Sequence, residues 1–483
     1  MNRKLRALLL CDISKWPYWI SVAFICRILF FFLVIHFRQY AKFDGFWGEI
    51  RSDSRDYLLP FDNFIKTGSY TPDYRMPGYG LLYLPLRLIF SKAVACNVII
   101  IIQLLLSTVS VYILALCAKT IFKHQSIFYL TYYIYVFSSF SSLVDPVILT
   151  ESISTSSLIF SVYFLTDFFN TNRSKQLILS GAFLTWTIFL KPVFCSLIIL
   201  FFVLLVVAFI RTKTKVLPAF LFLIPFLLAD GIWTIRNYII YKQVSPLTRT
   251  VWFPWVSSSY LLPTAELVEA WGGDIQFVEP TADTYWFINK KPVMIGSDKN
   301  NDTVPFPAYI YTSQFNRDSL KLVKNMIIRI QVDSSMSVLQ KKQYQDVIIL
   351  KLKRYTQSIK TEKPFLYYVR SNYKRLIEFV FSMHTISRLF INNFITRFYS
   401  TYYYCTVFLS LLGFLLLIPF IFKLSIESVV AFIPIYTILI HPVFIKFSEN
   451  RYLIPAYPFM IICASYSILW LYHRIFKEKH QPN

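Results

Sequence analysis

The sequence predicts an all-α polytopic membrane protein, with about ten transmembrane helices and an inserted extracytoplasmic subdomain of α or mixed structure. Of its 483 residues, 56% are hydrophobic and only 16% are charged, whereas roughly a quarter is charged in soluble proteins. The apolar residues also gather in blocks such as 98–116, 193–210 and 407–422, close to the ~20 residues that cross a bilayer. Several such blocks predict several spans.

The formal net charge of +23 does not indicate a nucleic-acid partner. Nucleic-acid binders carry Lys and Arg on a soluble, contiguous patch or stripe. In this chain the basic residues stand at the ends of the apolar blocks instead. Their placement indicates control of membrane topology and attraction to anionic lipid or phosphate.

Basic clusters fix the orientation of the spans, because short cytoplasmic loops carry the excess of Lys and Arg. The clusters at 3–6 and 474–479 place both termini inside. Alternation between these ends gives the spans 16–35, 93–118, 127–143, 154–169, 177–190, 193–210, 216–233, 402–422, 426–444 and 453–472. The block 79–90 contains Pro85 and Arg87, so we expect it to lie along the outer surface as an interfacial helix.

This topology divides the chain into three parts. Residues 1–238 form a transmembrane module with an external loop at 38–78, residues 239–400 form the extracytoplasmic subdomain, and residues 401–483 supply the last helices. The subdomain begins rich in Pro, Gly, Trp and Asp, and its part at 319–381 predicts basic amphipathic helices. Richness in Phe, Tyr, Ile and Lys with few glycines is associated with AT-rich bacterial genomes, which indicates a bacterial cytoplasmic (inner) membrane.

The first external loop carries the residues best suited to chemistry. Asp53 and Asp56 are three positions apart, so they share a face on a helical turn, beside Arg51 and Arg55. Two carboxylates in this setting can act as a general base and as a ligand for a divalent metal or a hydroxyl. The alternative is a solvated loop with local ion pairs.

Several motifs follow one another along the chain. The first loop reads Asp53-Ser-x-x-Tyr57, then Gly68-x-Tyr70, then Arg75-x-Pro-Gly-Tyr79. Downstream motifs are Thr150-Glu151, Lys191-Pro192, Trp233-Thr-Ile-Arg236-Asn-Tyr238 and Glu449-Asn-Arg451-Tyr-Leu-Ile-Pro455. In this order they resemble the GT-C class of polytopic glycosyltransferases, the group that includes protein mannosyltransferases and the aminoarabinose transferase of lipid A. All five elements map to the predicted external surface, which implies one cleft.

The resemblance implies a polyprenyl-phosphate-linked sugar as donor, a lipid, polysaccharide or protein as acceptor, and inversion at the anomeric carbon. Asp53 is then expected to deprotonate the acceptor hydroxyl, and Asp56 to orient it or hold a divalent cation. The tight acidic pair of some members is missing, so metal dependence stays open. The expected ligands of the donor phosphate are Lys191, Arg236, Arg451 and Arg75. Other expected cleft residues are Tyr57, Glu151 and Glu449.

Each of these residues also has a structural interpretation. Glu151 can cap a helix at the interface, and Lys191 can snorkel from the end of a span. Arg236 and Arg451 can anchor their spans, although both are predicted outside, where the positive-inside rule does not require them.

Arg27 lies within the first span, where an unpaired charge is costly. We therefore expect it to face the bundle interior or a cavity. Asp145 and Asp230 lie near predicted outer span ends, and each is a candidate partner for Arg27 or a candidate cleft residue.

Two other functions fit a polytopic protein. A flippase or transporter of lipid-linked oligosaccharide would place ionisable residues along a path at mid-membrane, often with repeated halves. Here the halves differ, and the notable charges collect at one face. A polysaccharide polymerase or ligase shares the polytopic build, but the acidic first loop favours a transferase with a monosaccharide donor.

Overall fold

The computed structural model describes residues 12–37, 43–248, 259–272, 308–333, 335–382 and 393–477. These residues form helices and their connections, with a single isolated bridge between Glu49 and Val147 and no strand among them. The predicted all-α class is therefore confirmed for this part of the chain. The basic cluster at 3–6 and residues 273–307 of the subdomain lie outside it.

The chain forms two compact units. The first comprises Met1–Arg249, Met383–Thr437 and Asn450–Asn483, and the second comprises Thr250–Ser382 and Ile438–Glu449. The predicted subdomain at 239–400 overlaps the second unit over 250–382.

Seven helices are long and apolar enough to cross a membrane, counting the described residues only. They are Trp16–His36, Lys92–Phe122, Thr150–Thr171, Pro192–Arg211, Leu217–Tyr241, Phe394–Phe422 and Ile426–Ile445. Each coincides with one of the predicted spans, so the polytopic prediction is confirmed.

The other three predicted spans are helical but fall short of these limits. α9 (Ser174–Leu190) has 17 residues, and α20 (Tyr457–Lys477) has 21 but contains Tyr, Ser and His residues that lower its hydropathy. The predicted span 127–143 is broken, because α6 (Gln125–Val136) ends early and the short α7 (Ser139–Ser142) follows. Serines are frequent at this break, and Ser142 Oγ donates to the Ser138 carbonyl at 2.8 Å.

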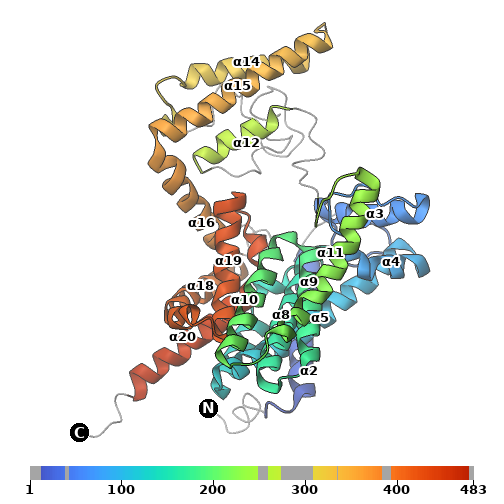
Figure 1. The fold of residues 1–483 in the computed structure, drawn as a ribbon, viewed down its shortest axis with the longest axis vertical. Helices are drawn as coiled ribbons and strands as arrows, with labels where there is room; N and C mark the ends of the chain where they lie inside the picture. Colours follow the sequence, from blue (N-terminus) through green and yellow to red (C-terminus); the bar gives the residue numbers. More distant parts are fainter. Residues whose placement is uncertain are drawn as a thin grey trace. The chain divides into compact units, whose positions relative to one another are not determined.

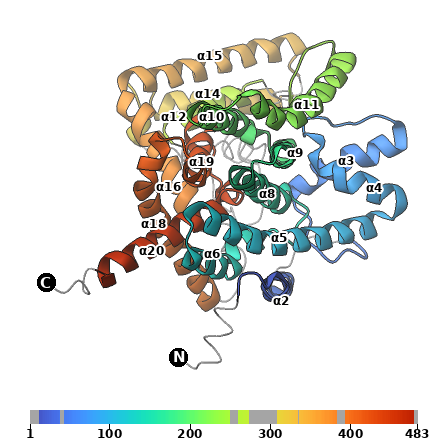
Figure 2. The ribbon, with the colours of Figure 1, turned by 60° about the horizontal axis from the view of Figure 1, so that its bottom comes forward.

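The first unit is built around α8 (Thr150–Thr171), which packs against α5 (Lys92–Phe122) and α9. α5 in turn contacts α2 (Trp16–Phe37) and α6, and α9 contacts α11 (Phe220–Tyr241) (Figure 2). Gly181 allows the close approach of α9 to α11, because a Cβ atom there would lie 2.1 Å from the Phe222 carbonyl oxygen. The unit also contains α10 (Cys195–Arg211) and, at the C-terminal end, α18 (Asn393–Phe422), which packs against α20, and α19 (Ile426–Leu439).

The first external loop contains α3 (Ser52–Thr67), a 3-10 turn at Pro77–Tyr79 and α4 (Gly80–Ile89). α4 has ten residues, too few to span a bilayer. Asp62 of α3 ties these helices to α5: it accepts hydrogen bonds from Tyr83 (2.8 Å), Arg87 (3.2 Å) and Lys92 (2.9 Å). Because Asp62 is nearly buried, these three donors fix the helices relative to one another.

The second unit contains α12 (Leu261–Ala270), α14 (Arg317–Val332), α15 (Val338–Glu362) and α16 (Ser371–Phe381), so the helices predicted at 319–381 are confirmed. Figure 1 shows α14 and α12 beside α15, around a core that includes Ile327 and Leu352. Arg375 is buried and donates to the carbonyls of Glu269 and Pro442 at 2.7 and 3.0 Å.

Candidate active site

The start of α3 is held against the segment that leads into α8. Glu49 N–H donates to the Pro146 carbonyl at 2.8 Å, and Ile148 N–H donates back to the Glu49 carbonyl at 3.1 Å. Ser54 Oγ then donates to the Ile148 carbonyl at 2.7 Å. Because this pairing aligns the first turns of α3 and α8, it brings Asp53 and Glu151 to the same region.

A buried amide inside the bundle supports the same segment. Gln103 of α5 donates from Nε2 to the carbonyls of Asp145 (2.8 Å) and Val147 (2.9 Å). Its Oε1 accepts from the Tyr79 hydroxyl at 3.1 Å, so one side chain links a span to both parts of the site. Both Gln103 and Tyr79 are almost fully buried, which makes these bonds costly to lose.

Four charged residues from different elements form a continuous chain of contacts, which we call the site cluster: Asp53, Arg451, Glu151 and Lys191. Arg451 Nη2 lies 2.5 Å from Asp53 Oδ2, and Arg451 Nε lies 3.9 Å from Glu151 Oε1. Lys191 Nζ lies 3.0 Å from the same oxygen of Glu151. Glu151 is 2% exposed and Lys191 is 6% exposed, so neither behaves as a solvated surface charge.

Tyr452 is a site residue that the sequence reasoning missed. Its ring lies 4.5 Å from Lys191 Nζ and 5.1 Å from Arg451 Cζ, and its hydroxyl accepts from Arg451 Nη2 at 3.2 Å. Both cations are thus stabilised by the same aromatic ring. The sequence did contain one indication of this role, because Tyr452 directly follows Arg451 in the motif at 449–455.

Arg75 and Asp56 form a neighbouring pair, with Nη2 and Oδ2 3.6 Å apart. The guanidinium also lies 5.2 Å from the centre of the Tyr57 ring and 5.9 Å from that of Tyr74. Burial raises the pKa of Tyr57, and burial together with a hydrogen bond to Asp56 raises the pKa of Tyr74. Both phenols therefore stay neutral around the arginine at pH 7.

The predicted carboxylates Asp53 and Asp56 do lie on one helix, but each is paired with its own arginine. In the described part of the chain, no group of three or more His, Cys, Asp or Glu side chains could hold a metal ion. Each ion pair uses the Oδ2 atom of its aspartate, so whether the pair also holds a divalent ion stays a prediction.

An apolar groove of about 560 Å³ runs beside the loop, between α4, α9 and α11. Its lining includes Gly78, Leu81, Trp186, Phe189 and Pro225. Trp186 Nε1 donates to the Gly78 carbonyl at 3.0 Å, and a Cβ atom at position 78 would lie 2.4 Å from the backbone of Phe189. Glycine is therefore required for this contact, which seats the loop on the end of α9, directly before Lys191.

No family model matches this chain, and no curated protein matches it. A solved structure, that of ArnT from Cupriavidus metallidurans in the apo state, aligns with 93% of this chain and 77% of its own. The two share 12% identity, with a TM-score of 0.31. Similarity at this level does not assign a family or a function.

Arg236 lies in a separate pair, with Asp73 of the first loop at 3.1 Å. It also donates to Asn237 Oδ1 at 2.9 Å and stacks 4.7 Å from the Trp233 ring. No ion pair of the described residues links Arg236 to the site cluster. Its role with the donor phosphate stays a prediction, and Asp73 is a partner that the sequence reasoning did not name.

Glu449 is the last residue of the segment that belongs to the second unit. Its place in the cleft therefore stays a prediction. Arg451, only two residues further along, belongs to the first unit.

Arg27 faces the bundle interior, as expected, and is 1% exposed. It donates to Ser142 Oγ, and its guanidinium lies 5.0 Å from the Tyr135 ring. Neither Asp145 nor Asp230 forms an ion pair with it: Asp145 accepts from Ser152 at 2.6 Å, and Asp230 accepts from the Leu247 N–H at 2.8 Å. The short α7 instead supplies one hydroxyl acceptor, on Ser142, to the Nη1 atom of Arg27.

Proposed function

We propose that the protein is an integral membrane glycosyltransferase of the GT-C type. It moves a sugar from a polyprenyl-phosphate-linked donor to an acceptor at the extracytoplasmic face, with inversion at the anomeric carbon. The observation that carries this proposal is the site cluster, in which a loop carboxylate, Asp53, lies 2.5 Å from a cation, Arg451, that is also close to the buried Lys191–Glu151 pair.

The support for an anionic ligand at this place comes from the position of its cations and not from an excess of positive charge. Three carboxylates, Asp53, Asp56 and Glu151, are matched by the three cations Arg75, Lys191 and Arg451. A phosphodiester adds one negative charge, and the phosphate that leaves adds more as its bond to the sugar breaks. Cations that are already fixed in a water-poor site stabilise this developing charge without further reorganisation.

The apolar groove supports a lipid-linked donor. It adjoins Gly78, which follows Arg75 by three residues, and Phe189, which precedes Lys191 by two. An isoprenoid chain in the groove would bury apolar surface and leave its phosphate near both cations. A nucleotide-linked donor has no apolar chain that would fill this groove.

The chemistry is then a single displacement. Asp53 accepts the proton of the acceptor hydroxyl while that oxygen attacks the anomeric carbon. The bond between this carbon and the phosphate oxygen breaks, and polyprenyl phosphate leaves with the electron pair, stabilised by Lys191, Arg451 and Arg75. The Oε2 atom of Glu151 is buried and makes no hydrogen bond to the described residues. We expect it to accept from a sugar hydroxyl when the bound donor displaces the side chains that cover it.

The test is transfer by purified protein in proteoliposomes, with membranes of the source organism supplying the acceptor. A panel of labelled polyprenyl-phosphate sugars is compared with the same sugars as nucleotide conjugates. We expect label to leave one lipid donor and free polyprenyl phosphate to appear in equal amount. Transfer from nucleotide sugars, or movement of the lipid donor across the bilayer without release of polyprenyl phosphate, would contradict the proposal.

A further inference from the structure

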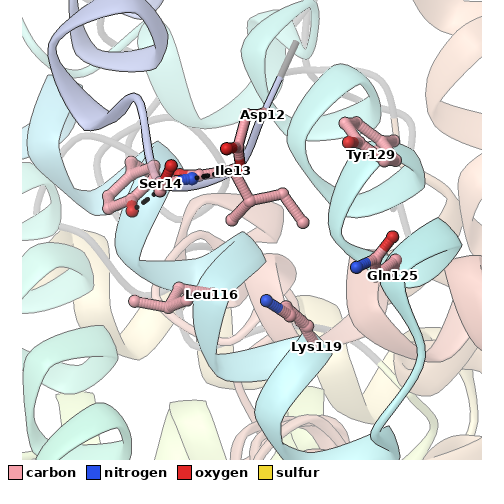
Figure 3. A pocket seen from close by; sticks show the side chains of 8 residues that line it. Asp12, Ile13, Ser14, Leu116, Lys119, Gln125 and Tyr129 are labelled. Atoms are coloured by element: carbon pink, nitrogen blue, oxygen red, sulfur yellow. Dashed lines mark hydrogen bonds between the residues drawn. The ribbon is translucent and has the colours of Figure 1, made fainter. Parts of the chain in front are cut away.

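A second cavity, of about 380 Å³, lies where α2 begins and α5 ends. Figure 3 shows its walls: Asp12 and Ile13 come from the segment before α2, Leu116 and Lys119 from the end of α5, and Gln125 and Tyr129 from the start of α6. Its volume lies in the range of small-molecule sites. The proposed transfer reaction does not use any of these residues.

We expect the cavity to lie at the membrane surface. The candidate spans Trp16–His36 and Lys92–Phe122 meet here at their ends, and Trp16 is 57% exposed. Lys15 and Lys123 flank the cavity in sequence. Interfacial tryptophan and span-end lysines are typical of the headgroup region, and the basic residues predict its cytoplasmic side.

Opposite charges line the cavity and attract each other without forming an ion pair. The Lys119 ammonium makes no ion pair with any described residue, and no nitrogen–oxygen distance within 4.0 Å joins it to Asp12. The Asp12 carboxylate accepts from the Ser14 N–H at 3.0 Å. That backbone N–H lowers the pKa of Asp12, so the carboxylate is charged at neutral pH. The space between the charges suits a ligand that carries both.

The segment that holds Asp12 is fixed in position. Trp19 Nε1 donates to the Asp12 carbonyl at 3.1 Å, and the Tyr112 hydroxyl of α5 donates to the Ile13 carbonyl at 3.2 Å. Ile13 itself is buried. The carboxylate is therefore presented by a backbone that is tied to both α2 and α5.

We propose that this cavity binds the headgroup of a phosphatidylethanolamine, with the lipid phosphate on Lys119 and Gln125 and the ammonium on Asp12. An anionic headgroup such as glycerol phosphate offers Asp12 only neutral hydroxyl donors, which bind a carboxylate less strongly than an ammonium does, and its net negative charge is repelled by Asp12. A quaternary ammonium carries the charge but no N–H, so it loses the charge-assisted hydrogen bond to the carboxylate. Free phosphate lacks both the ammonium and the acyl chains that keep a lipid at the end of two spans.

The experiment measures lipid binding to the purified full-length protein in detergent by native mass spectrometry. Phosphatidylethanolamine, phosphatidylcholine and phosphatidylglycerol with identical acyl chains are titrated in parallel, and inorganic phosphate serves as the fourth arm. We expect phosphatidylethanolamine to bind at least tenfold more tightly than the other three. Equal or tighter binding of phosphatidylglycerol or phosphate to the unmodified protein would overturn the proposal, and this comparison needs no variant.

Two variants separate the charges. Lys119→Gln is expected to weaken the binding of phosphatidylethanolamine and of phosphatidylglycerol by about tenfold each, because both lipids lose the same phosphate contact. Asp12→Asn is expected to remove the preference for phosphatidylethanolamine over phosphatidylcholine. Lys123→Gln, an exposed neighbour that does not line the cavity, should leave all affinities unchanged. Unchanged phosphatidylethanolamine binding in Lys119→Gln, or a loss equal to it in Lys123→Gln, would also overturn the proposal.

Discussion

Removing Lys191 alone should destabilise the protein more than removing Lys191 together with Glu151. At 3.0 Å and an effective dielectric constant of about 20, the two charges attract by about 5.5 kcal/mol. In Lys191→Met, Glu151 keeps only Arg451, at 3.9 Å, for which the same calculation gives about 4.3 kcal/mol. Breaking a buried pair on one side typically costs about 3–5 kcal/mol, and the remaining arginine places this variant near 3 kcal/mol.

The double variant Lys191→Met/Glu151→Gln removes both charges and should recover to within about 1 kcal/mol of the unmodified protein. The free energy of unfolding is measured by reversible denaturation of the purified protein in SDS, followed by tryptophan fluorescence at pH 7. Lys175→Met, an exposed lysine on α9, serves as the matched control and should stay within about 0.5 kcal/mol. A loss below about 1 kcal/mol in Lys191→Met, or a double variant less stable than the single one, would refute the reasoning.

Two further predictions concern the first loop. Gly78→Ala should cost about 1–3 kcal/mol in unfolding free energy, because its methyl group would lie 2.4 Å from the Phe189 backbone. Gly231 lies in a helix with open space around it, so Gly231→Ala should instead raise the unfolding free energy by up to about 1 kcal/mol. Equal effects of the two substitutions would contradict the close approach of Gly78 to Phe189. Asp73→Asn should lower the unfolding free energy by up to about 1 kcal/mol, since it weakens the partly exposed pair with Arg236. Arg236→Gln should cost somewhat more, because it also removes the contact with the Trp233 ring. Of these two variants, only Arg236→Gln should raise the KM for the lipid donor. An unchanged KM would contradict binding of the donor phosphate by Arg236 and would show that this residue only anchors the first loop.

The spans were predictable because their signal is local. A block of about 20 apolar residues is recognisable without its neighbours, and seven of the predicted spans are helices of sufficient length. The break at α7 was not recognised, because its block is apolar enough for a span, and the four serines between 138 and 142 were not weighed against that apolar signal.

The ion pairs inside the site were harder to predict from the sequence. Basic residues at the span ends predicted that Asp53 and Arg451 share one face of the membrane, but these residues are 398 positions apart, and sequence order does not determine the contact. Arg236 and Arg451 look alike in the sequence, because each is an arginine at a predicted outer span end. Arg236 nevertheless forms its ion pair with Asp73, outside the site cluster. Which arginine meets which carboxylate depends on helix packing, including the contact of Gly78 with α9, and this is a three-dimensional property.

The central claim is that Asp53 is the general base of sugar transfer. The most direct measurement is the rate of transfer from the lipid-linked donor for Asp53→Asn beside Asp44→Asn, a matched change at an exposed aspartate earlier in the same loop. Because a general base contributes about 10²–10⁴-fold, kcat should fall by that factor in Asp53→Asn and stay unchanged in Asp44→Asn. Undiminished transfer by the Asp53→Asn protein would contradict the account.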